Sequence, residues 1–270
     1  MDKRLMLSSY LKLAEALPLL EDDILFIASD LHTLAIEAKS RGERFDVNTF
    51  IESFQQVLFN GTIVVPAYTD DLWKNDTYDI RNSKPTTGAM SNKVFRRSDF
   101  SRTSDPLHSV FVWGRDKEEI MTLNPDSTFG IGSIFDYLYQ KKAKMICIDV
   151  HLQNSFTFVH YVEEKLRVNY RKYYHLKINV LDKDGNESMK SLNFHTKRPW
   201  ILTDLYELQQ SFGADGIKQN FKFGNTKIQY FELERAHDYV IKYIRSGKRL
   251  YQVDLTHFLK RLLKRLVGRK

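Results

Sequence analysis

Apolar runs and amphipathic stretches alternate along the first 165 residues of the chain. Short apolar runs rich in β-branched side chains indicate buried strands, and apolar residues at every third or fourth position indicate helices. The predicted strands cover residues 24–28, 61–66, 108–113 and 145–150. The predicted helices cover residues 6–17, 30–38, 88–97, 133–140 and 156–165, with one more after Asp46 or Asn48 that carries Phe50, Phe54 and Leu58 on one face. The alternation predicts an α/β fold: a three-layer α/β/α core with a mainly parallel central sheet.

The pattern changes after residue 170, where paired strands replace the alternation. Residues 174–181 and 189–195 flank an Asp-Gly turn signal, and residues 217–223 and 227–231 form a second predicted hairpin. Residues 201–210 and 233–245 are predicted helices. We therefore expect antiparallel hairpins in the C-terminal half. No linker interrupts the chain, which favours a single domain over residues 1–254, followed by a basic amphipathic helix over residues 255–270.

The longest predicted loop covers residues 67–87 and is polar. A loop of this length inside a compact domain is usually functional or disordered. Its aromatic residues Tyr68, Trp73 and Tyr78 favour an ordered, functional loop.

Composition indicates a packed globular protein of a reducing compartment. Hydrophobic residues make up 42% of the 270 residues, and Cys147, within an apolar run, is the single cysteine. The first residues lack the pattern of a signal peptide, and no apolar run is long enough to cross a bilayer. We therefore expect a cytoplasmic protein.

The net charge of +7 is concentrated at the end of the chain. Residues 245–270 hold nine basic residues against Asp254, so the rest of the chain is close to −1. The body is thus no general polyanion binder, and we expect no nucleic-acid partner, although the tail raises that alternative. The tail fits either a helix docked on the body or one that binds the anionic inner face of a membrane peripherally.

Candidate catalytic chemistry centres on His160 and Glu163. Their spacing of three places both on one helix face, where a carboxylate can orient a histidine as a general base; a plain surface pair is the alternative. Asp105, His108 and Ser109 lie where a loop enters a predicted strand.

The segment Thr128-Phe-Gly-Ile-Gly-Ser133 precedes a predicted helix. Free amides at such a start can hold a phosphate or a thioester oxygen, and an ordinary capped loop is the alternative. No Walker sequence, Gly-x-Ser-x-Gly elbow or His/Cys pattern for a metal is present, so we expect no metal.

Six segments together resemble the acetyl-CoA-dependent aminoglycoside 3-N-acetyltransferase family, over roughly residues 22–235. Arg102–Ser109 is similar to the family's Arg-Ser-x-His-Pro-x-x-Ser signature, and Thr157–Glu163 to its Thr-x-x-His-x-x-Glu signature. The other matching segments are Ile24–Leu31, Gly61–Thr69, Tyr78–Arg97 and Phe129–Ser133.

The resemblance implies direct acetyl transfer from acetyl-CoA to a primary amine on a sugar, with His160 as the general base. It implies coenzyme or thioester contacts from Ser29, Asp30, Thr69, Arg102, Ser109, Gly130 and Ser133. Candidate substrate contacts are Tyr68, Asp70, Trp73 and Asp79.

The chain departs from the family where the base would find its partner. Asp105 stands where the signature usually has His, and His195 stands near the place of a family Glu. The candidates for the residue that orients the base are therefore Asp105, His108, Glu163 and His195.

Acidic and basic residues balance in the long loop, which suits a weakly cationic acceptor. We expect an amino sugar, a class that includes the nucleotide-linked amino sugars of surface-polysaccharide biosynthesis. The alternatives are an aminoglycoside antibiotic, or a non-catalytic member that binds coenzyme or sugar.

Overall fold

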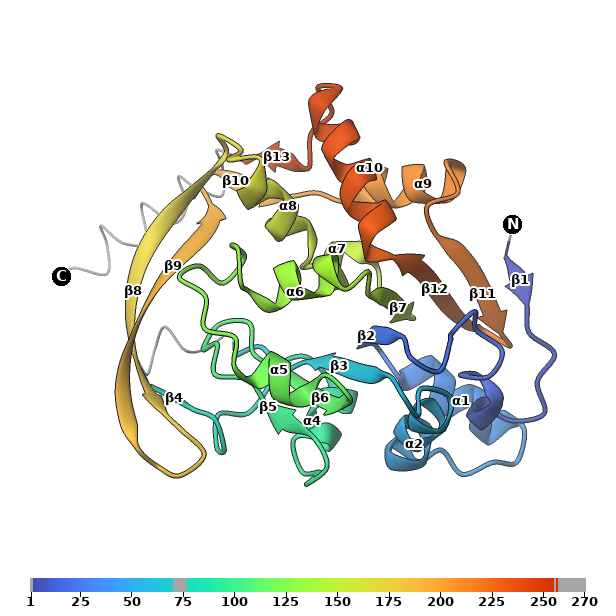
Figure 1. Ribbon diagram of the computed structural model, residues 1–270. Coiled ribbons are helices and arrows are strands. Elements are labelled where there is room, and N and C mark those ends of the chain that lie inside the picture. Colours follow the sequence, from blue (N-terminus) through green and yellow to red (C-terminus); the bar gives the residue numbers. More distant parts are fainter. Residues whose placement is uncertain (1, 70–76, 255, 257–270) are drawn as a thin grey trace.

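The computed structural model describes residues 2–69, 77–254 and 256, and its centre is an eight-stranded sheet (Figure 1). In sheet order the strands are β1 Lys3–Arg4, β11 Gln219–Phe223, β12 Thr226–Glu232, β7 Lys144–Ile148, β2 Ile24–Ser29, β3 Thr62–Pro66, β6 Val110–Gly114 and β5 Ser101–Arg102. Strand β2 lies between β3 and β7, and its apolar residues are buried on both faces.

The predicted α/β fold is confirmed, and the sheet is mixed. Among the described strands of this eight-stranded sheet, β7–β2–β3 pair in parallel, and so do β1 and β11. The expectation of a mainly parallel sheet therefore holds at the centre. The other neighbours are antiparallel because β12 returns from β11 through a tight turn, and β6 runs back beside β3.

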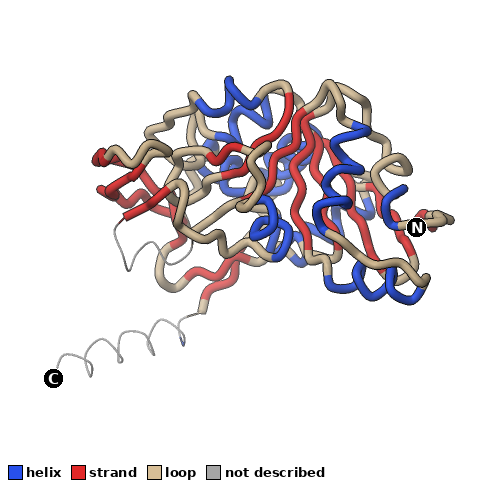
Figure 2. The backbone as a smooth tube through the Cα atoms, turned by 90° about the horizontal axis from the view of Figure 1, so that it is seen from below, coloured by secondary structure: helices blue, strands red, loops and turns tan. Residues whose placement is uncertain are grey.

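Helices cover both faces of the sheet and complete three layers (Figures 1 and 2). One layer holds α1 His32–Ser40, α2 Val47–Val57 and α4 Ala89–Val94. The other holds α5 Lys117–Met121, α6 Ile134–Gln140, α7 Leu152–Ser155, α8 Val159–Lys165, α9 Tyr206–Ala214 and α10 Leu233–Arg245.

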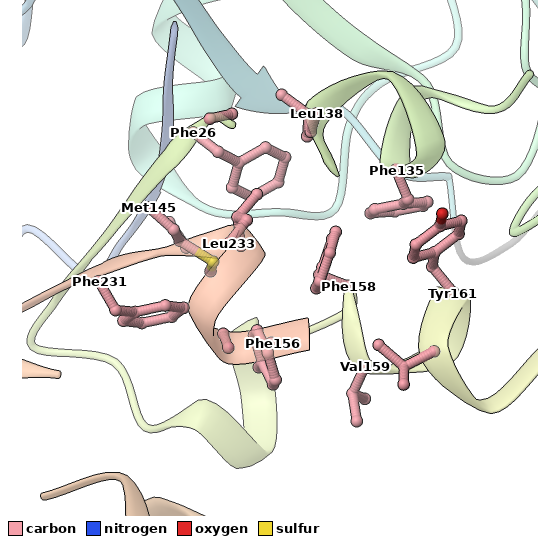
Figure 3. Packing of buried hydrophobic residues seen from close by; sticks show 14 of the residues in the cluster. Phe26, Phe135, Leu138, Met145, Phe156, Phe158, Val159, Tyr161, Phe231 and Leu233 are labelled. Atoms are coloured by element: carbon pink, nitrogen blue, oxygen red, sulfur yellow. The ribbon is translucent and has the colours of Figure 1, made fainter. Parts of the chain in front are cut away.

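The alternation of side chains along β2 explains the two cores. Ile24 and Phe26 face the cluster under α6–α10, whereas Leu25 and Ile27 face the cluster under α1 and α2. Figure 3 shows the first cluster, in which Phe26, Met145 and Phe231 of the sheet lie opposite side chains of the α6–α8 layer.

A long curved hairpin, called the arm below, stands beside the core at the left of Figure 1. It consists of β8 Arg171–Leu181 and β9 Glu187–Lys197, and β4 Thr77–Asp79 joins β8 in parallel. Ile178, Val180 and Leu192 of the arm pack with Tyr78 and Leu107 in a small third core. This packing fixes the arm against the loop that leads into β6.

Two local predictions are wrong. Residues 6–17 form only a 3-10 turn, η1 Tyr10–Lys12, which the Ser9 hydroxyl caps at the Leu11 amide. The apolar residues that follow are buried in the core through turns, without a continuous helix. The predicted helix over residues 201–210 begins instead as strand β10 Ile201–Thr203, which pairs with β13 Tyr251–Val253 before α9 starts. Pairing with a strand fifty residues away leaves no local signal.

The predicted terminal helix over residues 255–270 lies outside the described residues, apart from Thr256. Within the described part of the chain, every helix is too short or too polar to span a membrane.

Candidate active site

The central residue of the site is His160, in the first turn of α8. Glu163 follows one turn later, and its Oε2 lies 2.7 Å from Nδ1 of the imidazole. The imidazole is 20% exposed and the carboxylate 1% exposed, so the histidine closes over a buried acid. In the described part of the chain, Nε2 of His160 forms no hydrogen bond. The helix spacing alone brings these two residues together, as the sequence predicted.

Two residues of the arm region also hold Glu163. Arg171, the first residue of β8, donates from Nη1 to Oε2 at 2.8 Å, and the Tyr170 hydroxyl donates to Oε1 at 2.8 Å. Sequence reasoning missed both residues because their contact with α8 depends on where the arm packs. The only available signal was an Arg three residues before the predicted hairpin, which has no specificity.

The surroundings keep the His160 imidazole neutral. Burial lowers its pKa, the Arg171 cation lowers it further, and the Glu163 carboxylate opposes both effects. For Glu163, burial raises the pKa, but the His160 and Arg171 contacts outweigh burial and the pKa is lowered overall. At neutral pH the site therefore holds a neutral imidazole beside an ionised carboxylate, as a general base requires.

A second imidazole, His108, also packs against the ring of Phe129. The Phe129 ring centroid is 4.6 Å from that of His108 and 5.3 Å from that of His160. Thr128 Oγ1 lies 3.1 Å from Nδ1 of His108 and donates to Asp105 Oδ2 at 2.8 Å. Burial lowers the pKa of His108 to about 4. Asp105 thus orients His108 through Thr128, a residue that sequence reasoning did not single out.

His195, on β9, is buried and does not reach the imidazole of His160 through its side chain. Its ring packs on Tyr173 at 4.7 Å between centroids, and burial lowers its pKa to about 4. Its backbone carbonyl accepts hydrogen bonds from Arg171 at 3.2 and 2.8 Å. Of the four predicted partners, Glu163 is the one that contacts Nδ1 of His160.

Antiparallel pairing explains why residues of distant segments meet here. Pro66, at the carboxyl end of β3, is paired with Val110 at the start of β6. The loop carrying Asp105 and His108 therefore emerges beside the residues that follow β3. The Tyr68 ring accordingly meets the His108 ring at 4.8 Å between centroids.

Three predicted coenzyme residues are tied together inside the protein. The Arg102 guanidinium donates to Ser109 Oγ at 3.1 Å, to Thr69 Oγ1 at 3.1 Å and to the Ala67 carbonyl at 2.6 Å, and it also contacts the Ser83 carbonyl. All three predicted residues are buried. This network holds the loop after β3 against β6. Because the polar atoms of the three side chains are bonded to one another and to the backbone, few remain to bind a ligand.

Ser29 and Asp30 lie at the carboxyl end of β2 and remain partly exposed. With Gly88 they line a cavity of about 510 Å³ beside the start of α1. Asp30 accepts the His32 amide at 3.0 Å, and the Ser29 hydroxyl lies 3.7 Å from the Met90 sulfur. This cavity lies at the carboxyl edge of the parallel strands, where α/β sheets bind ligands.

Several amides of the glycine-rich turn before α6 are bonded within the turn itself. The Ser133 hydroxyl accepts the Asp136 amide at 3.2 Å, and Asp136 accepts the Gly132 amide at 2.9 Å. Gly130 packs against Glu164 and lines a separate cavity of about 520 Å³. The arrangement is that of a capped loop, the alternative given by the sequence.

The predicted substrate residues are placed unequally. Tyr68 contacts His108, whereas Asp79 ends β4 and accepts the amides of Arg81 and Asn82 at 2.8 and 3.1 Å. Asp70 and Trp73 lie outside the described residues.

A buried carboxylate that orients a neutral histidine, set in a three-layer α/β core, is an arrangement that general-base catalysis can use. The profile of the aminoglycoside 3-N-acetyltransferase family matches residues 35–245, so the chain belongs to this family. The predicted enzyme class, an N-acetyltransferase with acetyl-CoA as co-substrate, is confirmed by this membership.

Solved structures with the same fold are similar over most of both chains. AAC-IIIb in a binary complex with CoASH has a TM-score of 0.71 at 15% identity, with 89% of this chain and 97% of that chain covered. AAC-VIa bound to sisomicin has a TM-score of 0.73 at 12% identity, with 88% and 97% covered. The YokD protein of Bacillus subtilis has a TM-score of 0.69 at 20% identity, with 88% and 97% covered. Among curated proteins, none matches the chain significantly.

Proposed function

We propose that the protein transfers the acetyl group of acetyl-CoA to a primary amine of an amino sugar, with Nε2 of His160 as the general base. One observation carries the proposal: a carboxylate buried to 1% exposure holds Nδ1 of His160 at 2.7 Å, while the ring stays 20% exposed. Glu163 is then the residue that orients the base.

His160 and solvent together account for the protons that move in the proposed reaction. Nε2 of His160 removes a proton from the sugar ammonium, and the free amine attacks the thioester carbonyl carbon. The C–N bond forms and the C–S bond breaks, so that the thiol of coenzyme A leaves with a proton from the imidazolium. The nitrogen loses its remaining extra proton to solvent, and the products are an amide and a free thiol.

We further propose that the coenzyme contacts the carboxyl end of β2, where Ser29 and Asp30 line the 510 Å³ cavity. Arg102 and Ser109 are assigned a structural role, because their polar atoms are hydrogen-bonded within the protein. No step of the chemistry depends on these contacts, which serve only to bind and position the thioester.

Charge balance favours a weakly cationic amino sugar, including a nucleotide-linked one of surface-polysaccharide biosynthesis. Glu163 is paired with Arg171, and Asp105 attracts the cation of Lys190, whose pKa burial lowers. A polycationic antibiotic would require carboxylates that are not already compensated. The family match and the sisomicin-bound neighbour support the alternative acceptor, an aminoglycoside.

Thiol release from acetyl-CoA tests the proposal. We expect release with nucleotide-linked amino sugars, less with sisomicin, and at least a hundredfold lower rates for His160→Ala, because a general base contributes about 10²–10⁴-fold. His151→Ala is the matched control, since His151 caps α7 and packs on Tyr206 instead. If sisomicin were acetylated faster than the nucleotide-linked amino sugars, the acceptor would be an aminoglycoside. Coenzyme binding without thiol release from any amine would indicate a non-catalytic member.

A further inference from the structure

Arg171 is a buried cation that touches both residues of the proposed base pair. Its side chain is 4% exposed, and Nε and Nη2 both donate to the backbone carbonyl of His195, which fixes the guanidinium to β9. Nη1 points to α8, where it lies 2.8 Å from Glu163 Oε2 and 2.9 Å from His160 Nδ1. The arm thereby reaches the proposed base through the side chain of Arg171.

These distances decide which nitrogen of His160 carries the proton. An ionised carboxylate only accepts hydrogen bonds, and Glu163 receives them from Arg171 and Tyr170. Nδ1 of His160 lies 2.7 Å from the same Oε2, a distance that requires a hydrogen between them. The neutral ring is therefore in the Nδ1–H form, and its lone pair lies on Nε2.

The same geometry opposes protonation of the ring. Nδ1 of His160, which is already a donor, lies 2.9 Å from Nη1 of Arg171. Protonation of the ring would therefore place the imidazolium charge beside the guanidinium charge. Lys197 on β9 adds a second repelling charge, and burial acts in the same direction. The Glu163 carboxylate is the main opposing charge. The remaining titratable groups that surround the ring and its partners are Glu164 on α8, Tyr170 before β8, His195 on β9 and His108 before β6.

We propose that Arg171 is a positioning residue of the reaction, which holds Glu163 ionised and His160 neutral in the Nδ1–H form so that Nε2 can accept a proton. The role of His160 as base comes from the proposed function. The protonation state of its ring is a property of the folded protein and is measured without turnover.

The first test needs no variant of Arg171. Long-range ¹H–¹⁵N spectra of the ¹⁵N-labelled full chain report the tautomer, and the His160 signals are identified by their loss in His160→Gln. We expect a neutral ring with the proton on Nδ1 at pH 7. A proton on Nε2, or an imidazolium at this pH, overturns the proposal.

The second test follows the His160 signals through pH in three variants. In Arg171→Gln we expect the pKa of His160 to rise by about 1–3 pH units, the usual effect of a neighbouring charge, and the acidic limb of kcat/KM to move with it. Arg171→Lys keeps the charge and should stay close to the wild-type profile. Lys172→Gln is the matched control, because Lys172 is the next residue along β8 and its side chain is exposed. This variant should leave the pKa of His160 and the acidic limb of kcat/KM unchanged.

The outcomes separate this proposal from the function on which it rests. A lower kcat in Arg171→Gln with an unmoved pKa and an unmoved acidic limb shows a merely structural role and overturns it. If circular dichroism shows that Arg171→Gln does not fold, the tautomer of the wild-type protein and the pH profile of Arg171→Lys still test the proposal. If His160→Gln retains the full rate while the spectra are as expected, the proposed base is wrong and the role of Arg171 in protonation stands.

Discussion

Replacement of Glu163 by Gln tests the buried ion pair at the centre of the site. The substitution keeps the shape of the side chain but removes the charge that accepts hydrogen bonds from His160, Arg171 and Tyr170. Arg171, 4% exposed, would then be left as a buried cation without its carboxylate partner. Removal of one partner of a buried pair typically costs about 3–5 kcal/mol.

We therefore expect the free energy of unfolding of Glu163→Gln to fall by about 3–5 kcal/mol in urea titrations. The rate should fall by about 10²–10⁴-fold, because Gln can donate to Nδ1 and so stabilise the tautomer with its proton on Nε2. The pH dependence of stability should also change. The pKa of Glu163 is lowered in the folded protein, so its contribution is present above the unfolded pKa and is lost as pH falls through the folded pKa. This part of the acid dependence should vanish in the variant.

Glu119→Gln is the matched control, since Glu119 also bonds a tyrosine and a cation, Tyr137 and Lys141, but is 54% exposed. Its free energy of unfolding and its rate should stay at wild-type values. If Glu163→Gln is as stable and as active as this control, the buried pair neither stabilises the fold nor orients the base, and our reasoning about the site fails.

Three further predictions concern other parts of the chain. Thr128→Val should remove the link between Asp105 and His108 and lower kcat/KM, whereas Thr128→Ser should retain it; equal rates would exclude a role for the link in the reaction. Cys147 should resist alkylation in the native protein at pH 8 and react only on unfolding, because burial raises its pKa to about 12; rapid native labelling detected by mass spectrometry would contradict its placement. Removal of residues 255–270 should abolish flotation with anionic liposomes if the basic tail binds membranes, and equal flotation of both forms would refute that prediction.

The charge balance of the site depends on how the arm packs against α8. Helix α8 supplies the histidine and its carboxylate, and the arm supplies the cation that compensates the carboxylate. The small core of Tyr78, Leu107 and the arm residues holds the arm in place. Mutations in that core, far from His160 in sequence, are therefore expected to act on the site through Arg171.

Features that depend on residues close together in the chain could be predicted from the sequence. The alternation of apolar runs predicted β2, β3 and β7, and the amphipathic pattern of residues 233–245 predicted α10 with its observed bounds. The spacing of His160 and Glu163 placed them on one helix face, where they meet at 2.7 Å. Each of these features follows from the period of a strand or a helix, which is readable within a few residues.

Tertiary structure alone decided which residues those features meet. The strands on either side of the parallel centre became antiparallel because β12 and β6 return beside β7 and β3, and β10 formed because β13 lies opposite. Arg171 reached Glu163, and Asp105 turned to His108 through Thr128, because the arm and the β6 loop pack where they do. Such contacts depend on the burial of surfaces between distant segments, and no local period encodes that burial.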